Sequence, residues 1–338
     1  MGLALALLSL ISCKKEWPDE SAPRAQVVAR HLVIADRPYG LSKDFALDGQ
    51  FVYWAEQTFQ ESMQRGPGPT QIVRMSRRGG TIDVLAEGGN RPTHLTLDGD
   101  FLYWLGQSSE PGSLHRLIYR VPKRGGDRTS LPDPTKRPQS SIGSFVPANG
   151  TVYFPTPTKI LASAPGQPIR VLADDQRFPR RLLIDGEYIY WNSDHGVLRH
   201  SLVGEGGVES ITTEPGAMLW AVDDDRVFWL SGDGRTLRWK ENAGQGGAIA
   251  YFGASGAVAS NVVYIIENST RQIRAIDLGP KTSSRGSGGR LIADIGDNGD
   301  SLVVDKNELW WIERERGFER SRLLRISIPP PAGRQRLP

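Results

Sequence analysis

A recurring aromatic pair constrains the fold of this chain more than any other feature. Five clear copies are followed by two weaker ones, in the order Tyr53-Trp54, Tyr103-Trp104, Tyr153-Phe154, Tyr190-Trp191, Phe228-Trp229, Tyr264-Ile265 and Trp310-Trp311. Successive copies lie 50, 50, 37, 38, 36 and 46 residues apart, close to the length of a four-stranded unit. The chain is therefore predicted to repeat one small β-sheet.

Each aromatic pair lies in the same local pattern of strands and turns. An apolar strand and a tight turn precede it, and the predicted turns are Asp48-Gly49, Asp98-Gly99, Asn149-Gly150, Asp185-Gly186, Asp224-Asp225, Ser260-Asn261 and Lys306-Asn307. Such residues suit the central positions of a two-residue hairpin, which favour positive φ. A third strand follows, then usually a glycine pair, and then a fourth strand. This pattern predicts an all-β propeller of seven four-stranded blades, with six or eight blades as the alternatives.

The repeated sheets must pack against one another and close into a ring. Because one blade cannot bury both of its faces, the aromatic pairs are interpreted as core residues that fill the wedges between blades. The last repeat supplies only three strands, near Ser301–Val304, Glu308–Ile312 and Leu323–Ser327. The upstream segment Ala25–Ala35 resembles a fourth strand, so it is predicted to complete the seventh blade and close the ring.

The first residues indicate where the protein resides. Met1–Ser12 is an apolar run too short to span a bilayer, and it ends Leu10-Ile11-Ser12-Cys13. This ending resembles the lipobox of bacterial lipoproteins, although no Lys or Arg precedes the apolar run. The resemblance implies that residues 1–12 are a signal peptide and that Cys13 carries acyl chains. Lys14, rather than Asp, follows the cysteine, which by resemblance to known sorting rules favours the outer membrane of the bacterial envelope.

Domain organisation follows from the extent of the repeats. Residues 13–24 are predicted to form a tether, residues 25–328 a single propeller domain, and residues 329–338 a disordered tail. Cys13 is the only cysteine, so no disulfide is expected within the chain. A formal net charge of +3 over 338 residues is too small for a nucleic-acid-binding surface.

Long loops predict which side of the disc contacts a partner. The loops between second and third strands share a side with the connections between blades, and they contain the insertions Phe59–Thr70, Ser108–Leu114 and Glu313–Arg320. The candidate residues of this face are Asn90, Arg91, Arg177, Arg180, Arg181, Asp194, His195, Asp297 and Asn298. Arg91, Arg180 and Arg181 either give the channel a positive mouth or are ordinary solvated residues.

No motif of the sequence predicts a catalytic residue. The five histidines, His31, His94, His115, His195 and His200, lack the spacing of a zinc site. The acidic segment from Asp294 to Asp300 superficially resembles a calcium loop, but its oxygen ligands are wrongly spaced. We therefore expect no cofactor, with a divalent ion such as calcium as the less favoured alternative.

The combined pattern resembles one known class of repeat. Asp-Gly-x-hydrophobic-Tyr-Trp, then a strand, Gly-Gly and another strand, is similar to YWTD/NHL-like propeller repeats over nearly the whole chain after residue 25. The resemblance implies a scaffold and little chemistry. The favoured hypothesis is a monomeric, lipid-anchored, non-catalytic platform for a protein or glycan of the envelope. The alternatives are a hydrolase or lactonase with a divalent metal in the channel, and a scaffold subunit of an outer-membrane complex.

Overall fold

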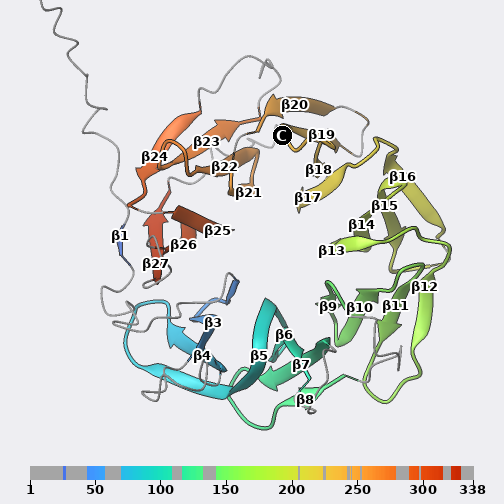
Figure 1. Ribbon diagram of the computed structural model, residues 1–338, viewed down its shortest axis with the longest axis horizontal. Coiled ribbons are helices and arrows are strands. Elements are labelled where there is room, and N and C mark those ends of the chain that lie inside the picture. Colours follow the sequence, from blue (N-terminus) through green and yellow to red (C-terminus); the bar gives the residue numbers. More distant parts are fainter. Residues whose placement is uncertain are drawn as a thin grey trace, which may run out of the picture.

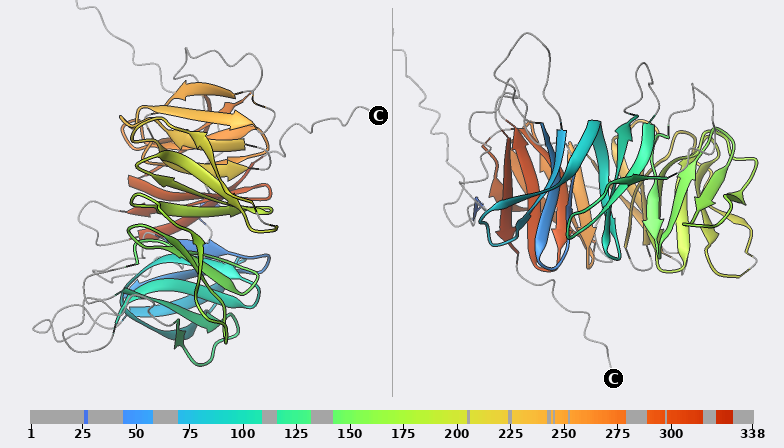
Figure 2. Two further views of the ribbon diagram at one scale, coloured as in Figure 1. Left: turned by 90° about the vertical axis from the view of Figure 1, so that its right-hand side faces the viewer. Right: turned by 90° about the horizontal axis from the view of Figure 1, so that it is seen from below.

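The chain forms a seven-bladed propeller around a central channel (Figure 1). The computed structural model describes residues 26–27, 44–57, 70–108, 116–131, 142–204, 206–223, 226–241, 244, 246–251, 253–278, 289–296, 298–314 and 321–328. These residues form antiparallel strands and turns, and none of them is helical. Seen from the side, the ring is a disc whose strands run between its two faces (Figure 2). The predicted all-β propeller is confirmed.

Within blades 1 to 6 the strands follow one another in chain order from the channel outward. Blades 1 and 2 share one strand. The long strand β5 ends blade 1 and begins blade 2, so these two blades form a continuous seven-stranded sheet. The strands of blades 1 to 3 are β2 (Phe45–Leu47), β3 (Phe51–Gln57), β4 (Thr70–Ser76), β5 (Ile82–Asp98), β6 (Phe101–Gln107), β7 (Arg116–Pro122), β8 (Thr129–Ser130), β9 (Val146–Ala148), β10 (Thr151–Pro155), β11 (Ile160–Ser163) and β12 (Arg170–Ala173). Those of blades 4 to 6 are β13 (Arg180–Asp185), β14 (Tyr188–Ser193), β15 (Gly196–Ser201), β16 (Val208–Thr212), β17 (Met218–Asp223), β18 (Arg226–Leu230), β19 (Thr236–Glu241), β20 (Gly246–Ala250), β21 (Ser255–Ala259), β22 (Val262–Glu267), β23 (Gln272–Asp277) and β24 (Arg290–Asp294).

Blade 7 combines the two ends of the chain. It consists of β25 (Asn298–Asp305), β26 (Glu308–Arg314), β27 (Ser321–Ser327) and the N-terminal strand β1 (Gln26–Val27). Strand β1 pairs antiparallel with β27, so that Gln26 lies opposite Arg325 and Val27 opposite Leu324. The prediction that an N-terminal strand completes the last blade is confirmed. The rest of the predicted strand, residues 28–35, lies outside the described residues.

The aromatic pairs form the core between blades in a regular way. The first member of a pair contacts the next blade, and the second contacts the preceding one. Tyr53 therefore shares a core cluster with Trp104, and Tyr103 shares one with Phe154. At the closure of the ring, Trp310 and Trp54 lie in one cluster. These side chains are almost completely buried, which removes apolar surface from water at about 25 cal/mol per Å². The interpretation of the pairs as core residues is confirmed.

The hairpin turns differ in part from the prediction. Asn149-Gly150 and Ser260-Asn261 occupy the two central positions with positive φ, as predicted. The Asp-Gly turns are displaced by one residue, because Asp98 pairs with Phe101 and the central residues are Gly99 and Asp100. Glycine takes the left-handed conformation there, with φ of 52° at Gly99. The aspartate instead precedes the turn, where its carboxylate can accept hydrogen bonds from the turn amides.

Candidate binding site at the channel mouth

A large cavity opens where the inner strands of several blades meet the connections between blades. Its volume is about 1030 Å³, and blades 1, 2, 3, 4 and 7 contribute to its walls. It lies on the face that carries the second-to-third-strand loops, because residues 154–157 and 178–183 both line it. Its size is at the upper end of the range for small-molecule sites. The cavity is therefore large enough for a ligand rather than for ordered water alone.

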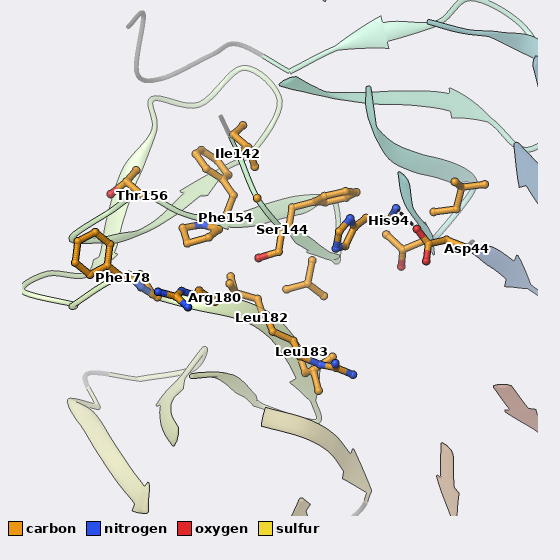
Figure 3. Close-up of a pocket in the computed structure, with 18 of the residues that line it drawn as sticks. Asp44, His94, Ile142, Ser144, Phe154, Thr156, Phe178, Arg180, Leu182 and Leu183 are labelled. Atoms are coloured by element: carbon orange, nitrogen blue, oxygen red, sulfur yellow. Dashed lines mark hydrogen bonds between the residues drawn. The ribbon is translucent and has the colours of Figure 1, made fainter. Parts of the chain in front are cut away.

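One wall of the cavity is apolar and largely aromatic. It is formed by Phe145, Phe154, Pro157, Phe178 and Leu182 of blades 3 and 4 (Figure 3). Phe178 is 56% exposed, an unusual position for a large aromatic side chain in a monomer. Its backbone adopts φ of 48°, and its N–H donates to the Pro157 carbonyl at 2.9 Å. A constrained backbone thus holds an aromatic ring at the solvent-facing edge of the cavity.

Bulges in the inner strands supply polar residues that line the same cavity. The pairing of the inner strand with the second strand is interrupted at His94, Arg181 and Ser301, in blades 2, 4 and 7. All three residues have positive φ, between 45° and 56°, although none is glycine. A bulge redirects a side chain that regular pleating would aim elsewhere, and such strained positions gather at functional sites. All three residues line the cavity.

The charges at the mouth form a partly compensated group. The Asp44 carboxylate accepts a hydrogen bond from the backbone N–H of His94 at 2.7 Å. Burial lowers the pKa of His94 below its ordinary value, and Arg116 and Arg181 lower it further, whereas Asp44 acts in the opposite direction. The imidazole is therefore expected to be neutral at pH 7. Arg116 donates to the Thr93 hydroxyl, and burial lowers the pKa of its guanidinium while Asp44 opposes that shift.

Arg181 has a different environment from Arg116. Its guanidinium donates through Nη2 to the Trp220 carbonyl at 2.7 Å, and this bond fixes one edge of the guanidinium. The surrounding channel wall lowers the pKa of Arg181, and the Tyr251 phenol opposes that shift. The side chain is nevertheless exposed by area, because the enclosed space in front of it is accessible to solvent. An arginine remains charged under these conditions, so Arg181 places a positive charge at the cavity.

One buried hydroxyl in the wall has no hydrogen-bond partner. Ser144 is 8% exposed, and its Oγ makes no hydrogen bond with the residues that the structure describes. The hydroxyl points into the space between His94 and Phe154 (Figure 3). A buried polar atom left without a partner costs free energy, so its presence requires an explanation. The Ser144 hydroxyl can donate its missing hydrogen bond to a ligand in the cavity.

The structure separates the residues that the sequence proposed for this face. Arg180 and Arg181 line the large cavity. Asp194 lines a second cavity of about 300 Å³ with Arg180, and its N–H donates to the Arg177 carbonyl at 3.0 Å. His195 is exposed in the turn between β14 and β15 and lines neither cavity.

The remaining proposed residues lie apart from these cavities or beyond the described part of the chain. Asn90 and Arg91 lie in β5, where it passes from blade 1 to blade 2, and their side chains are outside the described residues. Asn298 is exposed at the start of β25, and Asp297 and Cys13 are outside the described residues. A binding role for any of these residues, and lipidation of Cys13, stay predictions.

Sequence reasoning missed several residues of the cavity, although a signal existed. Four polar residues of the cavity stand four residues before the aspartate that precedes the turn in repeats 1, 2, 4 and 7: Arg181, which the sequence analysis named, and Asp44, His94 and Ser301, which it missed. Alignment of the repeats with one another would have shown a column of polar residues in an otherwise apolar strand. Ser144 falls in the same column of repeat 3, four residues before Ala148, whereas the aromatic wall has no comparable signal, since apolar residues at strand ends resemble core residues.

The described residues give no indication of a metal centre or a membrane helix. Among them, no group of three or more His, Cys, Asp or Glu side chains is placed to hold a metal ion. Asp297 of the predicted acidic segment falls outside this description. No described segment forms a helix that is long and apolar enough to cross a bilayer.

Comparison with known proteins supports the fold alone. No family model and no curated protein matches the chain. Among solved structures, a streptogramin B lyase aligns at 13% identity and a TM-score of 0.56, covering 87% of this chain and 95% of its own. The CNH domain of AfRom2 aligns at 9% identity and a TM-score of 0.57, covering 88% of this chain and 99% of its own. BamB from Moraxella catarrhalis aligns at 14% identity over 85% of both chains, with a TM-score of 0.47. The two alignments with TM-scores above 0.5 support a shared propeller architecture, and at identities this low no function transfers with it.

Proposed function

We propose that this protein is a non-catalytic binding platform of the bacterial envelope, which engages its partner through the channel mouth. The observation that carries the proposal is the cavity of about 1030 Å³, which aromatic residues and the two arginines Arg180 and Arg181 line together. Pockets of this size that combine apolar surface with a few placed polar groups are the usual binding sites of proteins. The exposed Phe178 at the rim extends the apolar wall toward a protein or glycan partner.

Two other functions suggested by the sequence have less support. A metal-dependent hydrolase or lactonase needs several converging oxygen ligands, and no group of three or more His, Cys, Asp or Glu side chains among the described residues is placed to hold a metal. A scaffold subunit of an outer-membrane complex also presents a binding face, and so remains a special case of the proposed platform. The buried aromatic wedges between blades favour a rigid platform, because packed interiors transmit little movement.

Site-specific photo-crosslinking in the native host tests the proposal. A photoreactive phenylalanine analogue at Phe178 should capture a partner, because this ring is at the rim of the cavity. The matched control places the same analogue at Arg78, which is exposed on the opposite face beside the Gly79 turn. Capture at Phe178 that disappears when Arg181→Glu is added supports the platform. Equal capture at both positions, or capture at neither, contradicts it.

Membrane attachment is a separate part of the proposal. The lipobox-like ending before Cys13 and the lysine that follows support a lipid anchor and location at the outer membrane. Two or more acyl chains hold a protein firmly on a bilayer, since each buried methylene contributes about 0.8 kcal/mol. Replacement of Cys13 by Ser should move the protein from the membrane fraction to the soluble fraction. Membrane association that persists in Cys13→Ser would count against the anchor.

A further inference from the structure

Two arginines at the mouth have no carboxylate partner among the described residues. Arg180 lines the cavity, is exposed, and makes no hydrogen bond or ion pair with the described residues. Arg181 makes one hydrogen bond, to the Trp220 carbonyl, and the group that favours its charge is a phenol rather than a carboxylate. A guanidinium fixed along one edge still presents donors suited to a carboxylate.

The acidic residues at the mouth do not neutralise these arginines. Asp44 lies between other cations, since its charge opposes the lowering of the pKa of both Arg116 and Arg314. It also accepts the His94 backbone N–H. Asp300 likewise acts on Arg314. These two carboxylates nevertheless disfavour a dianion at the same mouth, because like charges repel in an enclosed space.

Arg180 and Arg181 line the same cavity as the aromatic residues. Arg180 and Phe178 are two residues apart, at the start of β13 and in the connection before it (Figure 3). Phe145 and Phe154 belong to blade 3 and line the interior. The unpartnered Ser144 hydroxyl lies on this side of the cavity. A ligand that contacts both the arginines and the exposed Phe178 ring must therefore carry an anionic group and an apolar body within one molecule.

We propose that the channel mouth recognises a carboxylate attached to an aromatic or branched apolar group. The carboxylate binds at Arg180 and Arg181 with a hydrogen bond from Ser144, and the apolar body packs against the exposed Phe178 ring. Such a group occurs at the C-terminus of a peptide that ends in a large apolar residue, and also in small aromatic acids. The inference rests on the proposed platform function and names the chemistry of its ligand.

Calorimetric titration of the purified protein tests this chemistry with matched pairs of probes. The first pair is 3-phenylpropionate and its neutral amide, and the second is a tetrapeptide ending in phenylalanine with a free or an amidated C-terminus. Each acid should bind at least about tenfold more tightly than its amide, because a hydrogen bond to a charged group contributes about 1.5–3 kcal/mol. Tight binding of the peptide acid alone identifies a peptide C-terminus, and comparable binding of both acids identifies a small-molecule site.

Variants assign the effect to the named residues. Arg181→Gln should weaken binding of the acids about tenfold to a hundredfold, and Ser144→Ala about two- to tenfold. Arg180→Gln should weaken it about two- to fivefold, and since Arg180 has no hydrogen bond within the described residues, this variant is not expected to disturb folding. The matched control is Arg78→Gln on the opposite face, which should leave binding unchanged. Thermal unfolding of each variant verifies the fold.

Two outcomes overturn the inference, and they are distinguishable from failure of the platform itself. Equal affinity for acid and amide shows that the arginines do not recognise a carboxylate. Equal losses of affinity in Arg181→Gln and Arg78→Gln show the same. If no acid binds while crosslinking at Phe178 still captures a partner, this inference fails and the proposed platform stands. If neither the acids nor the crosslinker detects a ligand, both fail.

Discussion

Single polar residues at the strand ends stabilise each blade and join it to the next. The Asp48 carboxylate accepts hydrogen bonds from the N–H groups of Gln50 and Phe51, both at 2.8 Å, and from the Tyr53 hydroxyl at 2.8 Å. It also pairs with Lys123 of blade 2 at 3.4 Å. In the same way Asp98 accepts the N–H of Gly150 in blade 3 at 2.7 Å. One aspartate thus closes its own hairpin and contacts the following blade.

Tryptophan side chains are fixed in a similar manner at the other end of the blades. The indole N–H of Trp191 donates to Gln176 at 3.0 Å, and that of Trp229 donates to Glu214 at 2.9 Å. Trp311 donates to Glu313 at 3.2 Å. A buried indole needs a partner for its N–H, and these bonds orient the rings that fill the wedges.

Replacement of Asp48 should reveal the contribution of the turn aspartates. Burial acts to raise the pKa of Asp48, but the amides of Gln50 and Phe51, then Tyr53 and Lys123, outweigh it and hold the pKa below 3.8. Asp48→Ala should lower the free energy of unfolding by about 2–3 kcal/mol at pH 7, measured by urea denaturation. Asp100→Ala, at an exposed turn position of the same face, is the control and should cost less than about 0.5 kcal/mol.

The same residue gives a pH dependence of defined sign. A carboxyl group with a depressed native pKa stabilises the fold above its unfolded pKa and loses that contribution as the pH falls through the native value. The stability difference between the wild-type protein and Asp48→Asn should therefore be constant above about pH 5 and shrink below about pH 3.8. A difference that grows on acidification would show that the carboxylate is not stabilised in the native state.

At the scale of elements, the closure between blades 7 and 1 depends on an arginine cluster. Arg77, which follows β4 of blade 1, forms ion pairs with Asp305 and Glu308 of blade 7. It also donates to the Asp48 carbonyl at 2.9 Å, and its guanidinium lies 5.0 Å from the Trp310 ring centre. Burial acts to lower the pKa of Arg77, but the two carboxylates outweigh it and raise that pKa. One buried cation therefore holds two ends of the ring together.

Removal of this cation should weaken the closure strongly. Arg77→Ala leaves Asp305 and Glu308 without their shared partner, although Arg325 still pairs with Glu308 at 2.9 Å. Because a broken buried ion pair leaves an uncompensated charge, we expect a loss of about 3 kcal/mol in the free energy of unfolding. The neighbouring Arg78→Ala, at an exposed position, is the matched control. Equal losses of unfolding free energy in the two variants would show that Arg77 does not stabilise the closure of the ring.

The repeat elements could be predicted because each one carries its own signal. The aromatic pairs, the turn residues and the alternating strands are local, and they specified the blades and even the incomplete seventh repeat. The displaced Asp-Gly turns show the limit of that reasoning, since Asp48 accepts the turn amides with its side chain and so precedes the turn rather than occupying its centre. The bulges at His94 and Arg181 were not predictable from a single repeat, because a bulge depends on pairing with the neighbouring strand.

At the scale of the whole molecule, the candidate site exists only in the closed ring. Asp44 and Ser301 line one cavity although more than 250 residues separate them in the sequence. Arg180 and Arg181 were identified from the sequence as residues of the working face, but their aromatic and hydroxyl counterparts come from blade 3. Local patterns therefore predicted the disc, whereas the composition of the mouth required the ring to be closed.

Closure itself rests on a short N-terminal strand, which allows a direct test. Strand β1 contributes two residues to the edge of β27, with Gln26 opposite Arg325. Deletion of residues 1–27 should expose that edge and lower the free energy of unfolding by about 1–3 kcal/mol, while deletion of residues 1–25 should not. Hydrogen exchange in a peptide covering Ser321–Ser327 should accelerate only in the longer deletion, because its amides lose their partner strand.

The two truncations discriminate between a structural and an incidental pairing. They differ by Gln26 and Val27 alone, so any difference in exchange within β27 belongs to the strand rather than to the residues before it. If both proteins exchange β27 at the same rate and unfold at the same temperature, the ring closes without this strand. If the longer deletion also reduces crosslinking at Phe178, closure is coupled to the mouth, since blades 7 and 1 both line the cavity.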